Sequence, residues 1–376
     1  MCFLLSCVFF ALSEKSRSKY ARNAIALIAI LIPCLLAGAR ADTIGTDVKV
    51  YVEPIYNAAQ KSSDFFSYLN QKWFYIWRYK YVRDFEIGFT TLIYVIEKVG
   101  GSFRTVLFFI HILIIAPIFL GLKRMRNRYP ICIEMLVFYL LFYNVSLNMM
   151  RQWIAMAFLF YGLSYLTTNK LNRYFGVIVM ASLFHTSALM GGVIWFLYQY
   201  SQKYRKCIKI GSVRLNGSYA PIKVFVYGCL VLISLNLIAT ILRTIGLAKY
   251  AGYIQGDGAI HFMPNQIILR LPIIILFIIR WKKMLLGDGL APFYGSMIVL
   301  DLLASQLISI NIYAFRISSF FSEYNMLSYA ALIYAGRKNR INQYITLLYV
   351  LGYMICYWVY YYAIMGTHAT FPYVFA

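Results

Sequence analysis

The chain has 376 residues, of which 61% are hydrophobic and only 13% are Asp, Glu, Lys or Arg. Soluble domains carry about twice that share of charged residues, so the composition excludes an ordinary soluble fold and indicates lipid as the solvent. The net charge is +23, from 36 basic and 13 acidic residues. The basic residues form short clusters between apolar runs, as in the cytoplasmic loops of membrane proteins, so no nucleic-acid partner is predicted.

Apolar runs that approach the ~20 residues of a membrane span follow one another along the chain. In chain order, the predicted spans are Ala24–Ala39, Val106–Leu122, Ile131–Leu147, Trp153–Leu166, Val224–Leu242, Ile267–Trp281, Pro292–Ile310, Ser318–Ala335 and Ile345–Tyr362. Met1–Leu12 is a short or partial span. The run Tyr174–Tyr200 is interrupted at Phe184-His185-Thr186-Ser187, which predicts two short helices in a re-entrant hairpin.

These runs predict an all-α fold, a multi-pass transmembrane helical bundle of about 10–12 membrane segments. We expect one integral membrane domain over residues 1–376, because the sequence contains no linker. The clusters that should be cytoplasmic are Lys15–Arg22, Lys123–Arg128, Lys170–Arg173, Lys203–Lys223, Arg280–Lys283 and Arg337–Arg340. An even number of crossings must separate successive clusters, so the polar stretch of residues 42–87 becomes an external loop.

Five polar side chains then fall at or near the external ends of helices. They are Asp47, Glu86, Arg151, His185 and Arg316. None of them was used to set the topology, which depends on the basic clusters alone. A reaction centre at the outer interface, suited to an anionic or polar substrate, is the simplest explanation of this placement.

The two arginines lie in short turns between predicted spans, Arg151 in Asn148-Met149-Met150-Arg151-Gln152 and Arg316 before Ile317-Ser318. An arginine cannot lose its charge, and at the membrane centre it costs roughly 2.5–3.5 kcal/mol on insertion scales. In an external turn, its planar fork can bind a phosphate through two hydrogen bonds. Two such side chains suit a diphosphate that gains charge as it leaves. The alternative is that each extends to the lipid headgroups.

His185 and the external acids have equally open interpretations. His185 lies in an apolar run beside Thr186 and Ser187, where it is either a hydrogen-bond donor to phosphate or a buried neutral ring bonded to a hydroxyl. Asp47 and Glu86 are candidates for a general base or for binding an acceptor hydroxyl. Each is otherwise a solvated loop charge, or an acid that the positive end of a helix favours.

Several chemistries lose support from the sequence. The seven cysteines include no C-x-x-C pair, and nucleotide-binding or hydrolase fingerprints are missing, so we predict neither a metal site nor a cofactor. Two further acids, Glu134 and Asp301, fall inside predicted spans. Such acids either pair with a neighbouring helix or line a transport pathway.

The same residues resemble a known family. Motifs of this kind, in this order, occur in the EpsG/Wzy-like family of bacterial polysaccharide polymerases. In this chain they are Arg40 with Gly45-Thr46-Asp47-Val48-Lys49-Val50-Tyr51, Glu86-Ile87-Gly88, Asn148-Met149-Met150-Arg151-Gln152-Trp153-Ile154-Ala155, Phe184-His185-Thr186-Ser187-Ala188 and Arg316-Ile317-Ser318-Ser319-Phe320-Phe321. Each motif is weak alone, but five in order make a specific signal.

The resemblance implies a fold akin to the membrane glycosyltransferases of the GT-C type. It also implies an undecaprenyl-diphosphate-linked polysaccharide as donor and an undecaprenyl-diphosphate-linked oligosaccharide repeat as acceptor. The enzyme would then lie in the bacterial cytoplasmic (inner) membrane among membrane lipid, with its active site facing the periplasm or exterior. A chain-length regulator is a candidate partner.

Combining both lines gives a hypothesis for the site. Arg151, Gln152 and Arg316 bind the donor diphosphate with help from Arg40, and His185 assists them. Asp47 or Glu86 orients or deprotonates the acceptor hydroxyl. Two other functions stay open: a ligase that joins finished polysaccharide to an acceptor, and a transporter or flippase of lipid-linked sugars that would depend on intramembrane acids instead.

Overall fold

The computed structural model describes residues 1–125, 129–203, 208–210, 213–215, 219–245, 261–310, 315–335 and 340–376. Parts of three predicted basic clusters (Lys123–Arg128, Lys203–Lys223 and Arg337–Arg340) and residues 311–314 before Arg316 lie outside this set. The chain divides into two compact units. The first comprises Met1–Gly192 and Met354–Ala376, and the second comprises Val193–Tyr353. The expectation of one domain stays a prediction.

Helices dominate both units. Within the described residues, five are long and apolar enough to cross a membrane: Lys19–Gly38, Phe103–Arg124, Ala220–Thr244, Ala291–Ser309 and Arg340–Ile364. The chain is therefore an all-α multi-pass membrane protein, as predicted.

The first unit is built around packed apolar helices. They are α1 (Cys2–Lys15), α2 (Lys19–Gly38), α6 (Phe103–Arg124), α7 (Ile131–Leu141), α8 (Tyr143–Asn148), α9 (Met150–Leu166) and α10 (Leu171–Ser182). Helix α6 packs against both α2 and α9, and α10 packs against α9. Polar side chains join these helices internally, as where the Ser6 hydroxyl lies 2.8 Å from that of Tyr139 and donates to the Ala29 carbonyl. This packing makes a rigid base for the segments between α2 and α6.

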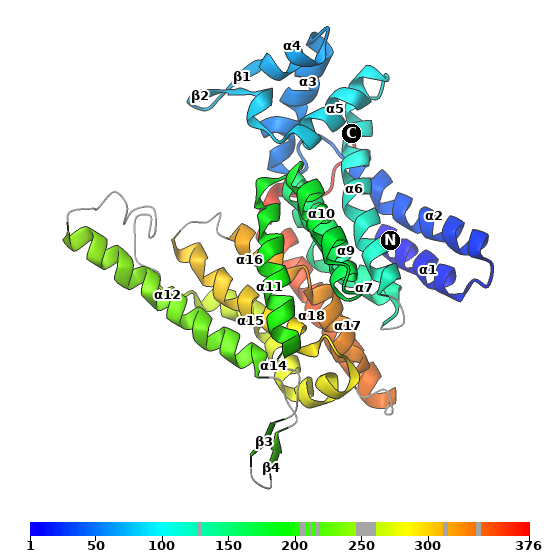
Figure 1. Cartoon of the computed structure of the whole chain (residues 1–376). Helices are drawn as coiled ribbons and strands as arrows, with labels where there is room; N and C mark the ends of the chain where they lie inside the picture. The colour runs from blue at the N-terminus through cyan, green and yellow to red at the C-terminus, as the bar shows by residue number, and fades with distance from the viewer. Residues whose placement is uncertain are drawn as a thin grey trace. The chain divides into compact units, whose positions relative to one another are not determined.

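The predicted external loop is folded. It contains a π-helical turn η1 (Val48–Val52), then α3 (Glu53–Lys61), α4 (Phe65–Asn70), β1 (Lys72–Tyr75), β2 (Arg78–Tyr81) and η2 (Val82–Asp84), and α5 (Ile87–Lys98) begins where it ends. The two strands form an antiparallel hairpin beside α3 and α4 (Figure 1). Tyr68 of α4 is fully buried and donates to the Thr90 carbonyl of α5, which ties the loop together.

Two predicted spans, and the run predicted as a re-entrant hairpin, are interrupted in the structure. The run 131–147 divides at Phe142 into α7 and α8, and the run 318–335 divides into α16 (Phe315–Ser322) and α17 (Asn325–Tyr334). The run Tyr174–Tyr200 breaks where predicted, into α10, the short 3-10 helix η3 (Thr186–Leu189) and α11 (Met190–Lys203). Of these three breaks, the one between α10 and η3 carries motif residues, Phe184 and His185.

The C-terminal segment returns to the start of the predicted external loop, just after α2. After α18 (Arg340–Trp358) come η6 (Val359–Ile364) and η7 (Thr367–Ala369). The last residues pair with the chain after α2: the Ala41 amide donates to the Val374 carbonyl at 2.9 Å, and the Ala376 amide donates to the Ala39 carbonyl at 3.0 Å. The tail is therefore part of the first unit.

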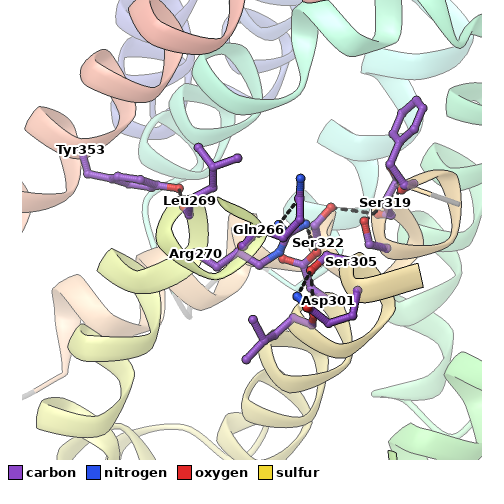
Figure 2. Close-up of polar contacts among 12 residues, drawn as sticks. Gln266, Leu269, Arg270, Asp301, Ser305, Ser319, Ser322 and Tyr353 are labelled. Carbon is purple, nitrogen blue, oxygen red and sulfur yellow. Dashed lines mark hydrogen bonds and ion pairs between the residues drawn. The ribbon is translucent and has the colours of Figure 1, made fainter. Parts of the chain in front are cut away.

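The second unit has α12 (Ala220–Thr244), α14 (Pro264–Gly287), α15 (Ala291–Ser305), η4 (Gln306–Ser309), α16 and α17, with a small hairpin of β3 (Ile208–Ile210) and β4 (Val213–Leu215). Figure 2 shows the polar network inside it. Arg270 Nη2 lies 2.9 Å from Asp301 Oδ1, and Arg270 Nη1 donates to the carbonyl and side-chain oxygens of Gln266. The Tyr353 hydroxyl donates to the Leu269 carbonyl at 2.7 Å. Asp301 thus pairs with a neighbouring helix, one of its two predicted roles.

Candidate functional site

The centre of the candidate site is an ion pair between two motifs. Arg151 lies in the first turn of α9, directly after the break that separates this helix from α8. Its Nη1 donates to Glu86 Oε2, and Glu86 is the residue that precedes α5. The two side chains are 20% and 14% exposed, so the pair is largely shielded but still reachable from solvent. An acid and an arginine that lie 65 residues apart in the sequence are thereby joined.

Two aromatic rings flank the Arg151 guanidinium. Its central carbon lies 4.7 Å from the centroid of the Tyr51 ring and 4.8 Å from that of Phe85. A cation over an aromatic face is attracted by the electrons of the ring, and the flat guanidinium suits this contact better than an ammonium does. The rings and the Glu86 carboxylate therefore hold the guanidinium in one orientation.

Glu86 also reaches the histidine motif. Its Oε1 accepts a hydrogen bond from the Thr186 amide at 3.2 Å, at the start of η3. Gly88 makes this approach possible, because its amide donates to the Leu183 carbonyl at 2.8 Å. A Cβ on Gly88 would lie 2.7 Å from that carbonyl oxygen, closer than real Cβ contacts. In the acid-x-glycine motif, Glu86 thus forms the hydrogen bonds, and Gly88 permits the close contact with Leu183 because it has no side chain.

His185 precedes η3 and is half-buried. Its Nδ1 accepts from the Ser187 amide at 3.1 Å and lies 2.5 Å from the Ser187 hydroxyl oxygen. A backbone amide only donates, so Nδ1 is the acceptor and the proton of the neutral ring is on Nε2. The contact with the Ser187 hydroxyl corresponds to one of the two interpretations drawn from the sequence. In this tautomer, Nε2 on the other side of the ring is a hydrogen-bond donor.

The Gly-Thr-Asp motif is held by the asparagine of the arginine motif. Asn148 Oδ1 accepts from the Thr46 hydroxyl at 2.8 Å and from the Asp47 amide at 3.0 Å. Gly45 has φ +87°, and a Cβ there would lie 2.6 Å from the Leu147 carbonyl oxygen. Glycine is required at this position both by the left-handed backbone and by the close contact.

Asp47 contacts Tyr51, one of the two rings that flank Arg151. Its Oδ2 accepts from the Tyr51 hydroxyl at 2.7 Å, one turn further along the chain. Burial, and then the neighbouring Asp47 carboxylate, raise the pKa of Tyr51 well above its ordinary value. Tyr51 therefore stays a neutral donor, and it links Asp47 to the ring that packs on Arg151.

Two predicted diphosphate ligands are deeply buried. Arg40 is 1% exposed, and its Nη2 donates to the Met150 sulfur at 3.1 Å. Burial lowers the pKa of Arg40 to about 10, which still leaves the side chain charged at neutral pH. Gln152 is 4% exposed and lies against the Met156 sulfur. In this conformation both lie beneath the site surface, and their predicted contact with a diphosphate stays a prediction.

Arg316 belongs to the second unit. It lies in α16 and is half-buried. The sequence predicted it at the end of a helix, and the described part of α16 begins one residue before it, at Phe315. Its predicted role beside Arg151 rests on the sequence alone.

One histidine of the site was missed from the sequence. His368 of η7 accepts from Asn148 Nδ2 at 3.1 Å through its Nδ1, which places it behind the Gly-Thr-Asp loop. Its φ is +68°, a conformation that costs energy in a residue other than glycine. The Gly45 amide also donates to the Ala369 carbonyl, so the tail supports the loop through both backbone and side chain. No motif surrounds His368, and sequence patterns gave no signal for it.

Comparison with models of protein families identifies the EpsG family. The model of the EpsG family covers residues 23–375, which is nearly the whole chain and includes every residue of the site described above. Searches of curated proteins and of solved structures gave no match.

Proposed function

Because the chain belongs to the EpsG family, we propose that it is a polysaccharide polymerase of the cytoplasmic membrane. It transfers a glycan from undecaprenyl diphosphate onto a lipid-linked repeat unit at the outer face. The observation that carries this proposal is the contact of Glu86 with both Arg151 and the Thr186 amide. It joins three separate sequence motifs around one cation.

The reaction exchanges one bond for another at the anomeric carbon of the donor. A hydroxyl oxygen of the acceptor bonds to this carbon, the bond to the diphosphate oxygen breaks, and the hydroxyl proton passes to a base. Negative charge develops on the departing diphosphate. A positioned cation that stabilises such charge typically contributes about 100-fold or more to the rate. Arg151 is suited to this role, since the positive end of α9 adds to its attraction for an anion.

The acids and the histidine divide the remaining roles. Both carboxylate oxygens of Glu86 already accept hydrogen bonds, from Arg151 and Thr186, which suits a positioning residue better than a base. We therefore propose Asp47 as the residue that orients or deprotonates the acceptor hydroxyl. Its carboxylate accepts a hydrogen bond from Tyr51, one turn further along the chain. His185 carries its proton on Nε2 and donates it in a hydrogen bond to a phosphate oxygen. Arg316 is proposed, from the sequence, as a second cation for the same diphosphate.

The test is the ladder of lipid-linked or surface polysaccharide from cells with and without the gene, separated on a gel. Deletion should leave single repeats, and Arg151→Ala should do the same at normal protein level. Arg173→Ala is the control, because Arg173 lies at the other end of α10 from His185 and should keep the full ladder. Full-length but unattached polymer would indicate a ligase, and failed delivery of repeats to the outer leaflet would indicate a transporter. Either result would overturn the proposal.

A further inference from the structure

The β1–β2 hairpin has two chemically different faces. Its register pairs Trp73 with Lys80 and Tyr75 with Arg78. Directly paired residues of an antiparallel hairpin share a face, and alternate residues of one strand do so as well. These four residues therefore form one surface, called here the Trp73 face. It combines two aromatic rings with two cations.

The Trp73 face is continuous with the arginine site. The Trp73 ring stacks on Phe85, with centroids 5.7 Å apart and planes inclined by 18°. Phe85 is in turn one of the two rings against the Arg151 guanidinium. On the same face, Lys80 Nζ lies 4.1 Å from the centroid of the Tyr75 ring. An aromatic and basic surface thus leads from Arg151 onto the hairpin.

The charges on this face act on one another. Burial lowers the pKa of Lys80, and the neighbouring Arg78 and Arg151 guanidinium groups lower it further, while Asp47 opposes them. Lys80 is therefore close enough to both guanidinium groups to be repelled by each. A bound group with negative charge would relieve that repulsion, while the rings offer flat apolar surfaces beside it.

We propose that the Trp73 face binds the sugar residues adjacent to the diphosphate of the lipid-linked substrate. This inference rests on the proposed function, and it adds a glycan subsite to it. Sugar rings have apolar C–H faces that stack on aromatic rings, whereas their acidic substituents and phosphates pair with Arg and Lys. Continuity with Arg151 places this subsite where the glycan would leave the diphosphate.

The opposite face provides the matched control. It carries Lys72, Phe74, Tyr79 and Tyr81, and Phe74 and Tyr79 pack edge to face with centroids 5.4 Å apart. Both rings are more than half exposed, and Trp77 at the tip is 91% exposed. These apolar side chains would suit contact with the membrane surface rather than with the arginine site. The membrane is therefore a second candidate partner of the hairpin, and the experiment must distinguish membrane contact from glycan binding.

The experiment measures glycan binding to the full-length protein in lipid nanodiscs. The probe is an oligosaccharide prepared by partial hydrolysis of the surface polysaccharide of cells that carry the gene, titrated by saturation-transfer NMR. The double variant Tyr75→Ala/Lys80→Ala should raise the Kd about tenfold, as expected for the loss of an aromatic and a charged contact. Phe74→Ala/Tyr79→Ala should keep the Kd within about twofold, a change too small for a lost contact.

Two results would overturn the subsite. One is an equal effect, or no effect, of the two double variants on the Kd. The other is unchanged binding together with quenching of Trp77 fluorescence by brominated lipids, which would place the hairpin in the membrane. The polysaccharide ladder of the deletion strain separates this inference from the proposed function. If the Kd depends on the hairpin face but the deletion strain keeps its full ladder, the polymerase function alone is refuted. If the deletion strain loses its ladder but the protein does not bind the oligosaccharide, the subsite alone is refuted.

Discussion

Single residues of the site act by connecting segments that are distant in the sequence. Asn148 is the clearest case, because its one amide group makes three hydrogen bonds. It accepts from the Thr46 hydroxyl and the Asp47 amide, and it donates to His368 Nδ1. This side chain therefore fixes both the loop that carries Asp47 and the C-terminal tail. The Asp47 amide and His368 Nδ1 together determine which end of the Asn148 amide group is oxygen and which is nitrogen.

Replacement of Asn148 by alanine should release both segments. The Thr46 and Asp47 donors lose their acceptor. The exposed Thr46 hydroxyl can bond water instead, but the half-buried Asp47 amide left unpaired costs about 1–3 kcal/mol. We expect a lower midpoint of thermal unfolding in detergent and a polysaccharide ladder reduced to single repeats. His368→Ala should give a weaker form of both effects, because Asn148 then loses one of its three hydrogen bonds.

The control is Asn70→Ala. Asn70 is an exposed asparagine that also makes side-chain hydrogen bonds, with Arg83 and with the Phe66 carbonyl, so its loss should cost little. An Asn148→Ala protein with an unchanged midpoint and an unchanged ladder would contradict the role of this residue.

Between elements, the decisive contact joins the start of α5 to the segment after α10. Gly88 approaches the Leu183 carbonyl closely enough for a hydrogen bond of 2.8 Å. Two residues earlier, Glu86 bonds the Thr186 amide and Arg151. Since all three contacts lie within one turn of α5, a small displacement of that helix end would break the ion pair and separate the histidine motif from it.

Gly88→Ala should produce this displacement. The new Cβ would lie 2.7 Å from the Leu183 oxygen, and backbone must move by several tenths of an ångström to accept it. Overpacking of this kind costs about 1–3 kcal/mol. We expect a lower unfolding midpoint and a shortened polysaccharide ladder, although the substituted residue bears no functional group.

Gly176→Ala is the matched control for that variant. Gly176 lies within α10, where a Cβ would meet no atom within 4 Å. Alanine favours a helix over glycine by about 1 kcal/mol, so this protein should be as stable as the parent or slightly more so. Equal behaviour of the two glycine variants would show that the close approach at Gly88 has no consequence.

Helices were easier to predict than their interruptions. The apolar run Val106–Leu122 lies within α6 (Phe103–Arg124), because a continuous apolar stretch specifies a helix without help from distant residues. The divisions at Phe142 and between α16 and α17 have neither glycine nor proline at the break, so no local signal marks them. They are set by packing against neighbouring helices, which a pattern along the chain does not contain.

The site shows the same division. Arg151 and Glu86 were predicted as candidates because the basic clusters place both at external ends of helices, where an arginine can bind phosphate and few acids are available. Their pairing with each other was not predicted, since it depends on how the external loop folds back onto α9. His368 lies far from every motif, and only the return of the tail brings it to Asn148.

At the scale of the whole molecule, charge is distributed between two compact units. Arg151 belongs to the first and Arg316 to the second. The second unit also contains the Arg270–Asp301 pair, whose side chains are 17% and 5% exposed. Both side chains are more deeply buried than those of Arg151 and Glu86, and removal of one partner would cost about 3–5 kcal/mol. Within that unit, Arg316 is the cation that the sequence motif assigns to the substrate.

A double-mutant cycle tests whether Arg151 and Arg316 act on the same group. The measured quantity is the initial rate of polymer formation in membrane vesicles supplied with lipid-linked repeats. Each single alanine variant should lose about 100-fold, the usual effect of removing one charge-stabilising donor. If both guanidinium groups stabilise one diphosphate, the double variant should lose far less than the product of the two single losses, because interacting residues are not additive. Arg151→Ala combined with Arg173→Ala calibrates the additive case. Multiplicative losses in the Arg151 and Arg316 pair would mean that the two cations serve separate steps, and the shared diphosphate would have to be abandoned.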